Sequence, residues 1–414
     1  MNLESHITRF TIPNGLRVVH EYDPTQAMAV VNLLYNVGSR DESPGQTGMA
    51  HLFEHLMFGG SANIPDFDGE LTAAGGQSNA WTSTDFTNFY EILPAANIET
   101  ALWLESDRML SLAFSDKALE IQRQVVVEEF KQVCLNRPYG DSDHLLRAMC
   151  YKTHPYRYPV IGKEFSHIEQ VTQDDVRRWF ASHYAPNNAV LAVTGNVTPD
   201  RLHTLVEKWF GLIPSRPVAP RTYADEAEPT EARLTETSGN VPHTSITIAY
   251  PMDRYGTQAY AAADAISDIL ANGRSSRFYR RLLMPGEHFT EIDASILGSE
   301  HPGLLLINAQ LIKDGPEAEA RAIAAINNLL GELAAEAPSG RELERCKNTV
   351  ESDRTFSMLP LLQRAQTYAM AEMHSEAPGD ALRRYRALTP AVVRDTAASL
   401  LRPERARTLI YRPA

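Results

Sequence analysis

The segment His51-Leu52-Phe53-Glu54-His55 contains the residue types best suited to chemistry. Residues three and four apart share one face of a helix, so His51, Glu54 and His55 are predicted to project together. Two imidazoles spaced i and i+4 can hold one Zn²⁺ ion at about 2.0–2.1 Å each. Glu54 can then act as a base toward water without being a ligand. The order H-x-x-E-H inverts the more common H-E-x-x-H motif, and the alternative is two helix-face histidines with ordinary polar partners.

A catalytic zinc site needs a third protein ligand and an open position, and two neighbouring glutamates are candidates. Glu128 and Glu129 lie in the sequence LEIQRQVVVEEFKQV. Valines lie three and four residues before Glu129 and four residues after it, so an apolar stripe is predicted to carry Glu129 inward. A carboxylate in such a stripe needs a cation partner. We therefore predict Glu129 as the ligand. The alternative is a buried glutamate paired with an arginine.

The elements that must position these residues form an α+β pattern. Strands are predicted at 9–12 and 16–20 around the turn Pro13-Asn14-Gly15, and at 27–37, 78–93 (as a pair) and 189–197. Helices are predicted at 47–58, 95–112, 116–135, 172–183 and 198–210.

The same succession of elements is predicted a second time. Residues 213–242 contain many prolines and acidic residues and read as a linker. After it come strands at 244–252, 301–311 and 408–413 and helices at 260–273, 316–335 and 339–356. The prediction is two homologous α+β halves, each an antiparallel or mixed sheet flanked by helices. The expected boundaries are 1–212 for the domain with the histidines, 213–242 for the linker and 243–414 for the second domain.

Composition narrows the function classes. The 414 residues are 43% hydrophobic and 22% charged, which excludes wholesale disorder. A net charge of −13 argues against a nucleic-acid or anionic-membrane partner and leaves open a cavity that attracts basic peptides. Three cysteines without a CxxC pair do not form a disulfide framework. We expect a soluble cytoplasmic protein, or a periplasmic one if a leader was removed.

Several motifs together resemble the pitrilysin-type (M16) zinc metallopeptidases. They are HLFEH, SNAWTSTDFTNFYEIL, and QRQVVVEEF with 73 residues between His55 and Glu129. The segments NRPYG (136–140) and HPYRYPVIG (154–162) are similar to the bacterial processing-peptidase-like branch. The resemblance covers essentially the whole chain, including the duplication, and implies one half of a clamshell. It implies one zinc ion per chain bound by His51, His55 and Glu129, with Glu54 as the general base of peptide hydrolysis.

The resemblance also implies where a substrate lies. In this family a peptide adds as a β-strand at the position of SNAWTS, so Asn79, Ala80, Trp81 and Thr82 are expected to contact it. The alternative for Trp81 is a packed core aromatic. One departure from the family is Gln122, seven residues before the third ligand, where members often carry a supporting glutamate. A neutral amide there is expected to tune the affinity for zinc.

A second departure concerns the C-terminal half. The family usually supplies an arginine and a tyrosine spaced R-x6-Y that hold the substrate carbonyl. Alignment of SSRFYRRLLMPGEHFTEIDAS puts Leu283 and Thr290 at these places, and neither side chain can replace the pair. Loss of one such donor costs about 10²–10³ in rate. We therefore predict a heterodimer, in which a homologous partner lacks H-x-x-E-H and carries the Arg/Tyr pair.

Three other interpretations stay open. The chain could be a self-sufficient monomeric or homodimeric peptidase that uses Arg280 or another basic residue. It could be a non-catalytic scaffold subunit, although such subunits typically lose part of the zinc motif, which is complete here. An unrelated zinc hydrolase acting on non-peptides would explain the local motif alone.

Overall fold

The computed structural model describes residues 7–113, 115–218, 220–224, 226–298 and 300–414. The chain forms two compact units that are interleaved along the sequence. The first unit contains the residues up to Lys131 together with Tyr158–Tyr223 and Thr355–Gly379. The second unit contains Gln132–Arg157, Ala224–Arg354 and Asp380–Ala414.

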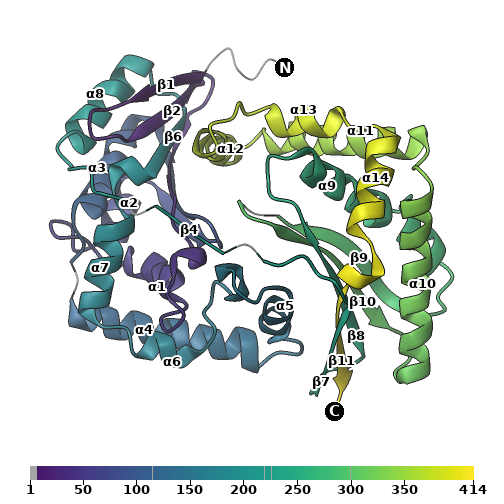
Figure 1. Cartoon of the computed structure of the whole chain (residues 1–414). Coiled ribbons are helices and arrows are strands. Elements are labelled where there is room, and N and C mark those ends of the chain that lie inside the picture. Colours follow the sequence, from purple (N-terminus) through teal and green to yellow (C-terminus); the bar gives the residue numbers. More distant parts are fainter. Residues whose placement is uncertain (1–6, 114, 219, 225, 299) are drawn as a thin grey trace. The chain divides into compact units, whose positions relative to one another are not determined.

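The first unit is built on a six-stranded mixed sheet (Figure 1). In spatial order its strands are β1 (Ile7–Thr11), β2 (Arg17–Tyr22), β6 (Ala189–Gly195), β3 (Met28–Tyr35), β5 (Thr87–Pro94) and β4 (Gln77–Thr82). Among the described strands of this sheet, β2 and β6 pair in parallel and the other neighbours are antiparallel. The predicted hairpin is confirmed: β1 and β2 join through Gly15, whose φ of 89° suits glycine. Strand β4 ends the sheet and pairs with β5 alone.

Helices cover both faces of this sheet. Along β3, Val31 and Leu33 belong to the core shared with α1 (Met49–Leu56) and α3 (Ile98–Leu110). Val30 and Leu34 project to the opposite face and pack with α12 (Leu361–Met373). A strand that is buried on both faces needs a nearly continuous apolar sequence, and MAVVNLLY provides one. The other helices of this unit are α2 (Phe67–Ala73), α4 (Asp116–Phe130), α6 (Phe165–Glu169), α7 (Gln173–His183) and α8 (Pro199–Phe210).

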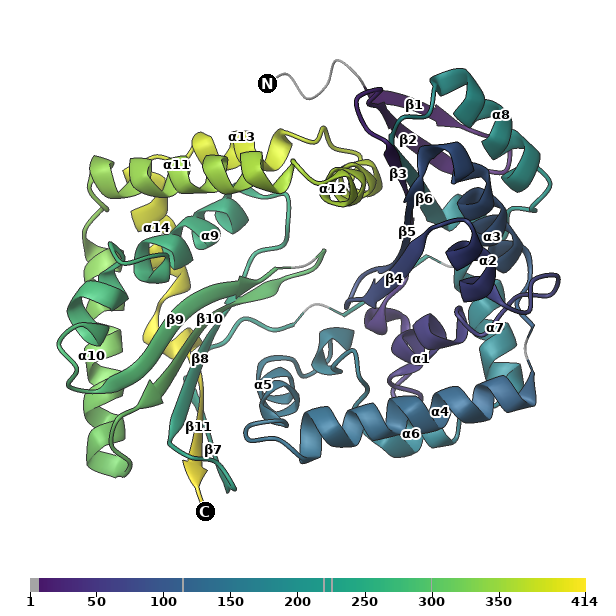
Figure 2. The ribbon, with the colours of Figure 1, turned by 180° about the vertical axis from the view of Figure 1, so that it is seen from behind.

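The second unit repeats the topology of the first (Figure 2). Its sheet has the order β7 (Arg233–Gly239), β11 (Arg407–Pro413), β8 (Ser245–Met252), β10 (Gly303–Leu311) and β9 (Phe289–Leu297). The first pair is parallel and the other pairs are antiparallel, which matches β2, β6, β3, β5 and β4 strand for strand. The predicted α+β fold with two similar halves is confirmed.

Helices also cover both faces of the second sheet. Helices α9 (Gln258–Ala271), α10 (Pro316–Ala335) and α14 (Pro390–Leu400) contribute to the core on one face. On the other face, Leu146 and Met149 of α5 (Ser142–Cys150) pack with Ala249, Leu304 and Leu409. Helices α11 (Gly340–Ser357) and α13 (Asp380–Arg386) complete this unit. Within the described ranges, no helix combines the length and the apolar character needed to cross a bilayer.

The compact units differ from the divisions expected along the chain. The expected linker 213–242 contains β7 at 233–239, because this edge strand is polar and mostly exposed and therefore resembles a loop in sequence. Two residues of that linker, 219 and 225, lie outside the described residues. Helix α12 packs in the first unit although it follows most of the second. The boundaries 1–212, 213–242 and 243–414 describe the sequence repeat and remain a prediction. The two compact units are defined by which residues pack together.

Candidate metal centre

Helix α1 carries the H-x-x-E-H residues, and its sequence explains its orientation. Leu52, Phe53 and Leu56 are buried in the core of the first unit, so the opposite face presents the histidines and Glu54. The helix begins after Gly48, whose φ of 87° lies in the left-handed region that favours glycine.

Glu42 fixes the beginning of α1, and the sequence reasoning missed it. Its carboxylate accepts hydrogen bonds from the backbone N–H groups of Gly48 (2.8 Å) and Ala50 (2.9 Å). A carboxylate at this end of a helix is favoured by the helix dipole. Burial raises the pKa of Glu42 well above its ordinary value, and these N–H groups oppose the rise. An acidic residue before a glycine that begins a helix is the sequence signal that could have identified it.

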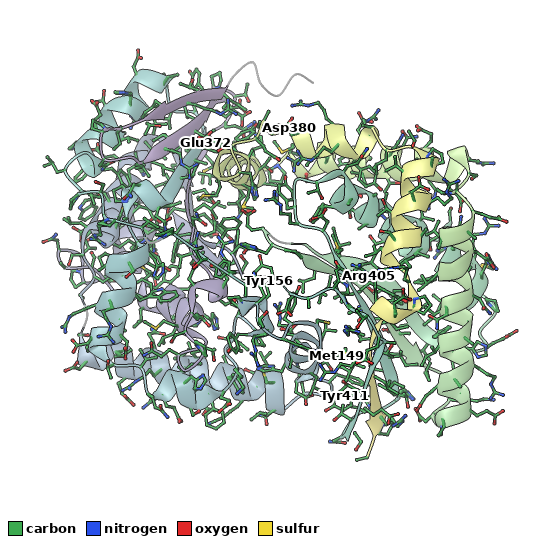
Figure 3. All side chains as sticks on the ribbon, in the orientation of Figure 1. Met149, Tyr156, Glu372, Asp380, Arg405 and Tyr411 are labelled. Carbon is green, nitrogen blue, oxygen red and sulfur yellow. The ribbon has the colours of Figure 1, made fainter. Side chains whose placement is uncertain are left out.

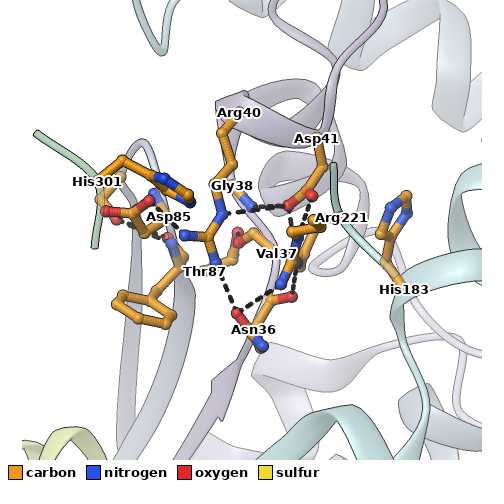
Figure 4. A network of polar contacts seen from close by, with 12 residues as sticks. Asn36, Val37, Gly38, Arg40, Asp41, Asp85, Thr87, His183, Arg221 and His301 are labelled. Carbon is orange, nitrogen blue, oxygen red and sulfur yellow. Dashed lines mark hydrogen bonds and ion pairs between the residues drawn. The ribbon is translucent and has the colours of Figure 1, made fainter. Parts of the chain in front are cut away.

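Arginines hold the loop that connects β3 to α1 (Figure 4). Arg40 forms an ion pair with Asp85 at 2.6 Å and donates to Asn36 Oδ1 at 2.8 Å. Arg221 pairs with Asp41 and donates to the same Asn36 oxygen at 3.0 Å. These charge-assisted bonds stabilise the loop that precedes α1 and thereby help to position the metal-binding face of the helix.

His51, His55 and Glu129 come together in the first unit. Glu129 Oε2 lies 3.7 Å from His51 Nε2 and 3.6 Å from His55 Nε2, and the three ligand atoms lie within 4.8 Å of one another. Tetrahedral zinc ligands at about 2.0–2.1 Å from the ion are separated by roughly 3.3 Å. Two imidazoles and a carboxylate also match the donor types of a catalytic zinc site. The residues therefore fit the ion.

Burial affects the protonation of the donors. Burial, and to a lesser degree the neighbouring His55, lower the pKa of His51 to about 4. His51 is therefore neutral near pH 7, which is the form that binds a metal. The side chains of His51 and His55 retain 14% and 25% of their exposure, so water reaches the site.

Glu128 and Glu129 are separated by the geometry of α4. Glu128 is exposed and forms an ion pair with Lys131 at 2.6 Å. The prediction that Glu129 lies in an apolar stripe is only partly correct. Val126 is fully buried, but Val125 is 45% exposed. Glu129 is placed by the packing of α4 against α1, and Gln122 lies two turns earlier on α4, half-buried.

Glu54 is hydrogen-bonded to Thr82 and is not one of the three candidate zinc ligands. The Thr82 hydroxyl donates a hydrogen bond of 2.5 Å to Glu54 Oε2. Burial raises the pKa of Glu54, while this hydrogen bond and the nearby His55 lower it. A carboxylate that is poised between these effects is suited to exchange a proton. Thr82 was predicted only as a substrate contact, so its position beside Glu54 is an addition from the structure.

The other predicted substrate residues lie on β4, at the edge of the sheet. Side chains alternate along a strand, so Ala80 shares a face with Thr82, and Asn79 shares the other face with Trp81. Ala80 packs against the core that includes α1, whereas Trp81 packs against the cluster that includes α12. Asn79 is exposed. Among the described strands β5 alone pairs with β4, and the Ala80 N–H donates to Asn79 Oδ1 at 2.8 Å.

The positions aligned with the Arg/Tyr pair lie in the second unit. Leu283 ends the turn Tyr279–Leu283 and packs against that unit's core. Thr290 is exposed on β9 and donates to the backbone oxygen of Gln310 at 3.3 Å. Arg281 forms an ion pair with Glu332. Neither Leu283 nor Thr290 carries a charged group or a phenol.

Two family models match this chain. The model described as insulinase (peptidase family M16) matches residues 17–164, which include every member of the candidate centre. The model described as peptidase M16 inactive domain matches residues 170–350. The chain belongs to the M16 peptidase family. Together with the complete H-x-x-E-H motif, this places it in a family of metallopeptidases.

Individual relatives agree with this assignment. The zinc protease PqqE of Helicobacter pylori is 30% identical over 67% of this chain and 64% of its own length. The mitochondrial-processing peptidase subunit beta of Saccharomyces cerevisiae is 30% identical over 49% of this chain and 44% of its own length. The chain thus spans between two fifths and two thirds of these M16 relatives. A crystal structure of a protease from Helicobacter pylori superimposes with a TM-score of 0.91, at 25% identity, over 98% of this chain and 99% of that one.

Proposed function

We propose that this M16 member is the zinc-bearing subunit of an endopeptidase. The observation that carries the proposal is the convergence of His51, His55 and Glu129 within 4.8 Å, on the same unit as the Glu54–Thr82 pair. Its relatives named zinc proteases support the metal and the reaction.

His51, His55 and Glu129 would hold the zinc ion, which when bound supplies a Lewis acid that polarises a carbonyl and lowers the pKa of water. Glu54 accepts the proton from the attacking water and returns it to the amine that leaves. Thr82 orients the Glu54 carboxylate through its hydroxyl hydrogen bond. Each step uses a residue of the first unit.

Edge strand β4 offers the peptide a place beside this centre. A substrate strand can pair with the edge of Gln77–Thr82 that faces away from β5, where it would replace the hydrogen bond from the Ala80 N–H to Asn79 Oδ1. Main-chain pairing binds an extended peptide without reading its side chains strictly. Thr82, at the end of β4, links the bound strand to Glu54.

We also propose that a homologous subunit completes the site. Leu283 and Thr290 stand where the family's arginine and tyrosine are expected, so these two positions do not supply the donors that hold the scissile carbonyl in the family. The yeast relative is named as a subunit, which supports an assembly of related chains. The partner would lack H-x-x-E-H and supply the Arg/Tyr pair.

A peptidase assay on quenched peptides tests both parts of the proposal. The chain is assayed alone and after co-expression with a homologue that carries R-x6-Y and lacks H-x-x-E-H. Glu54→Gln serves as the blank in both arms, with zinc content measured to show that the blank is loaded. Activity in the mixture that is absent from the chain alone is the expected result.

Two outcomes contradict the proposal in different ways. Full activity of the chain alone, abolished by Glu54→Gln, would overturn the partner and retain the zinc peptidase. No Glu54-dependent cleavage in any arm, with zinc bound, would overturn the peptidase itself and favour a scaffold subunit.

A further inference from the structure

A cavity of about 1090 Å³ lies wholly within the second unit. It lies where β7 and β11 begin and β8 ends, and its wall includes the end of α5 and residues 226–233. Figure 3 labels Met149 and Arg405, which both line it. No residue of the metal centre contributes to it, so the proposed peptidase chemistry leaves the cavity without a role.

Three arginines line this cavity: Arg233, Arg405 and Arg407. Arg233 and Arg407 are register partners in the parallel pair of β7 and β11, so their side chains leave the sheet on the same face. Burial lowers the pKa of Arg407, and the positive charges of Arg233 and Arg405 also lower it, whereas Cys150 and Glu231 raise it. The Arg407 guanidinium is therefore close enough to be repelled by those of Arg233 and Arg405, and a bound anion would relieve this repulsion.

Among the described residues, the hydrogen bonds of the Arg233 and Arg407 side chains go to backbone carbonyl groups. Arg407 Nη1 donates to the carbonyl oxygens of Glu231 (2.7 Å) and Ala406 (3.2 Å), and Arg233 Nη1 donates to that of Met149 at 3.4 Å. In the described part of the chain, neither guanidinium pairs with a carboxylate. The Nε and Nη2 donors of both side chains thus remain for a ligand. Their planar fork geometry suits a carboxylate or a phosphate.

Arg405 adds a buried donor. Its Nη2 donates to the carbonyl oxygen of Pro251 at 2.8 Å, and its Nη1 pairs with Glu228. Its Nε is buried and has no hydrogen-bond partner among the described residues. A buried N–H group that lacks a partner is destabilising, and a bound anion or water would supply that partner.

One carboxylate of the cavity wall pairs with Arg405, but among the described residues none forms an ion pair with Arg233 or Arg407. Glu226 accepts from the backbone N–H groups of Thr153 (2.5 Å) and His154 (2.6 Å), and Glu228 is paired with Arg405. Glu231 and Asp253 are exposed at the wall.

Part of the remaining wall is apolar, beside polar residues such as Lys152 and Ser399. Tyr151, Met252, Ala263 and Leu400 line the cavity and are buried. Ligand sites typically combine such walls with a few convergent polar groups, in volumes of about 300–1,000 Å³. The size and lining of this cavity therefore suit an organic molecule rather than an inorganic ion alone.

We propose that this cavity binds an organic anion whose carboxylate or phosphate group is held by Arg233 and Arg407. Its apolar part lies against Met252 and Leu400. The site is independent of the metal centre and of the proposed peptidase function.

Isothermal titration calorimetry on the full chain tests this site. The Glu54→Gln chain is used so that no peptide is cleaved. The probes are inorganic phosphate, an acetylated Ala-Ala-Phe peptide with a free C-terminal carboxylate, and the same peptide amidated. We expect saturable binding of the free acid and none of the amide. Competition by phosphate would support recognition of a phosphate group, and lack of competition would support recognition of the carboxylate.

Variants assign the binding to the arginines. Arg233→Gln and Arg407→Gln should weaken binding about ten- to a hundredfold, because each loses a charge-assisted hydrogen bond. Arg407→Lys keeps the positive charge but removes the planar guanidinium group, so we expect a smaller loss of affinity. Arg402→Gln is the control, since Arg402 is 47% exposed, pairs with Glu404 and does not line the cavity. No binding of either anion, or equal binding by every variant with a native unfolding midpoint, would overturn the proposal.

Discussion

Thr82, at the end of edge strand β4, donates its hydroxyl hydrogen bond to the carboxylate of Glu54 on α1. This bond joins the strand that is proposed to pair with a peptide to the residue that is proposed to move the proton. Its partners come from different elements, so the bond depends on the packing of α1 against β4. Because the hydroxyl contacts the residue that is proposed to move the proton, we expect its loss to slow the chemical step.

Thr82→Val keeps the shape of the side chain and removes the donor. A hydrogen bond to a charged group contributes about 1.5–3 kcal/mol, so kcat should fall about ten- to a hundredfold in the active assembly. Thr82→Ser restores the hydroxyl and should recover most of the rate. Steady-state kinetics with both variants check this, and an effect of Thr82→Val on KM alone would contradict the role in positioning Glu54.

Glu129→Gln and Glu128→Gln form a matched pair on α4. The first change removes a carboxylate from the donor set, so the affinity for zinc should fall at least a hundredfold. The second change touches an exposed residue paired with Lys131 and should leave the affinity unchanged. Competition with a chromophoric chelator measures both dissociation constants. Equal affinities in the two variants would remove Glu129 from the site.

Because His20 is buried, we expect the protein to lose stability in acid. It is buried on β2, and burial lowers its pKa from 6.5 to about 4. The unfolded chain therefore binds more protons than the folded chain between these values, so stability falls as the pH decreases from about 6.5 to about 4. The linked change is about 3 kcal/mol at pH 4.

Urea unfolding of His20→Leu across this pH range measures the effect. The difference in unfolding free energy between the variant and the natural chain should shift by about 3 kcal/mol in favour of the variant between pH 7 and pH 4. His203→Gln, at a side chain that is 49% exposed, is the control and should show no such shift. A difference that is independent of pH would show that His20 is not the titrating group.

Glu42→Gln tests the beginning of α1. An amide has one oxygen to accept from two backbone N–H groups, so one buried donor loses its partner at a cost of about 1–3 kcal/mol. Chemical unfolding at pH 7 measures the loss. Glu70→Gln on the exposed side of α2 should change stability by no more than about 0.5 kcal/mol. Equal stabilities of these two variants would argue against the role of Glu42.

The sequence by itself determined the features that depend on local periodicity. The spacing of His51, Glu54 and His55 places them on one face of α1 because a helix has a fixed period. The turn at Gly15 and the apolar run of β3 are equally local, and both were predicted correctly. The duplicated order of strands and helices also follows from the succession of such patterns.

Only the tertiary structure decided the relations between residues that are distant in the chain. The return of α12 to the first sheet, the polar strand β7 and the contact of Thr82 with Glu54 have no local signal. The juxtaposition of Arg233 and Arg407 requires the parallel pairing of β7 with β11. Such contacts arise from the burial of apolar surface between whole elements, and the period of a single segment does not specify which other segment it will meet.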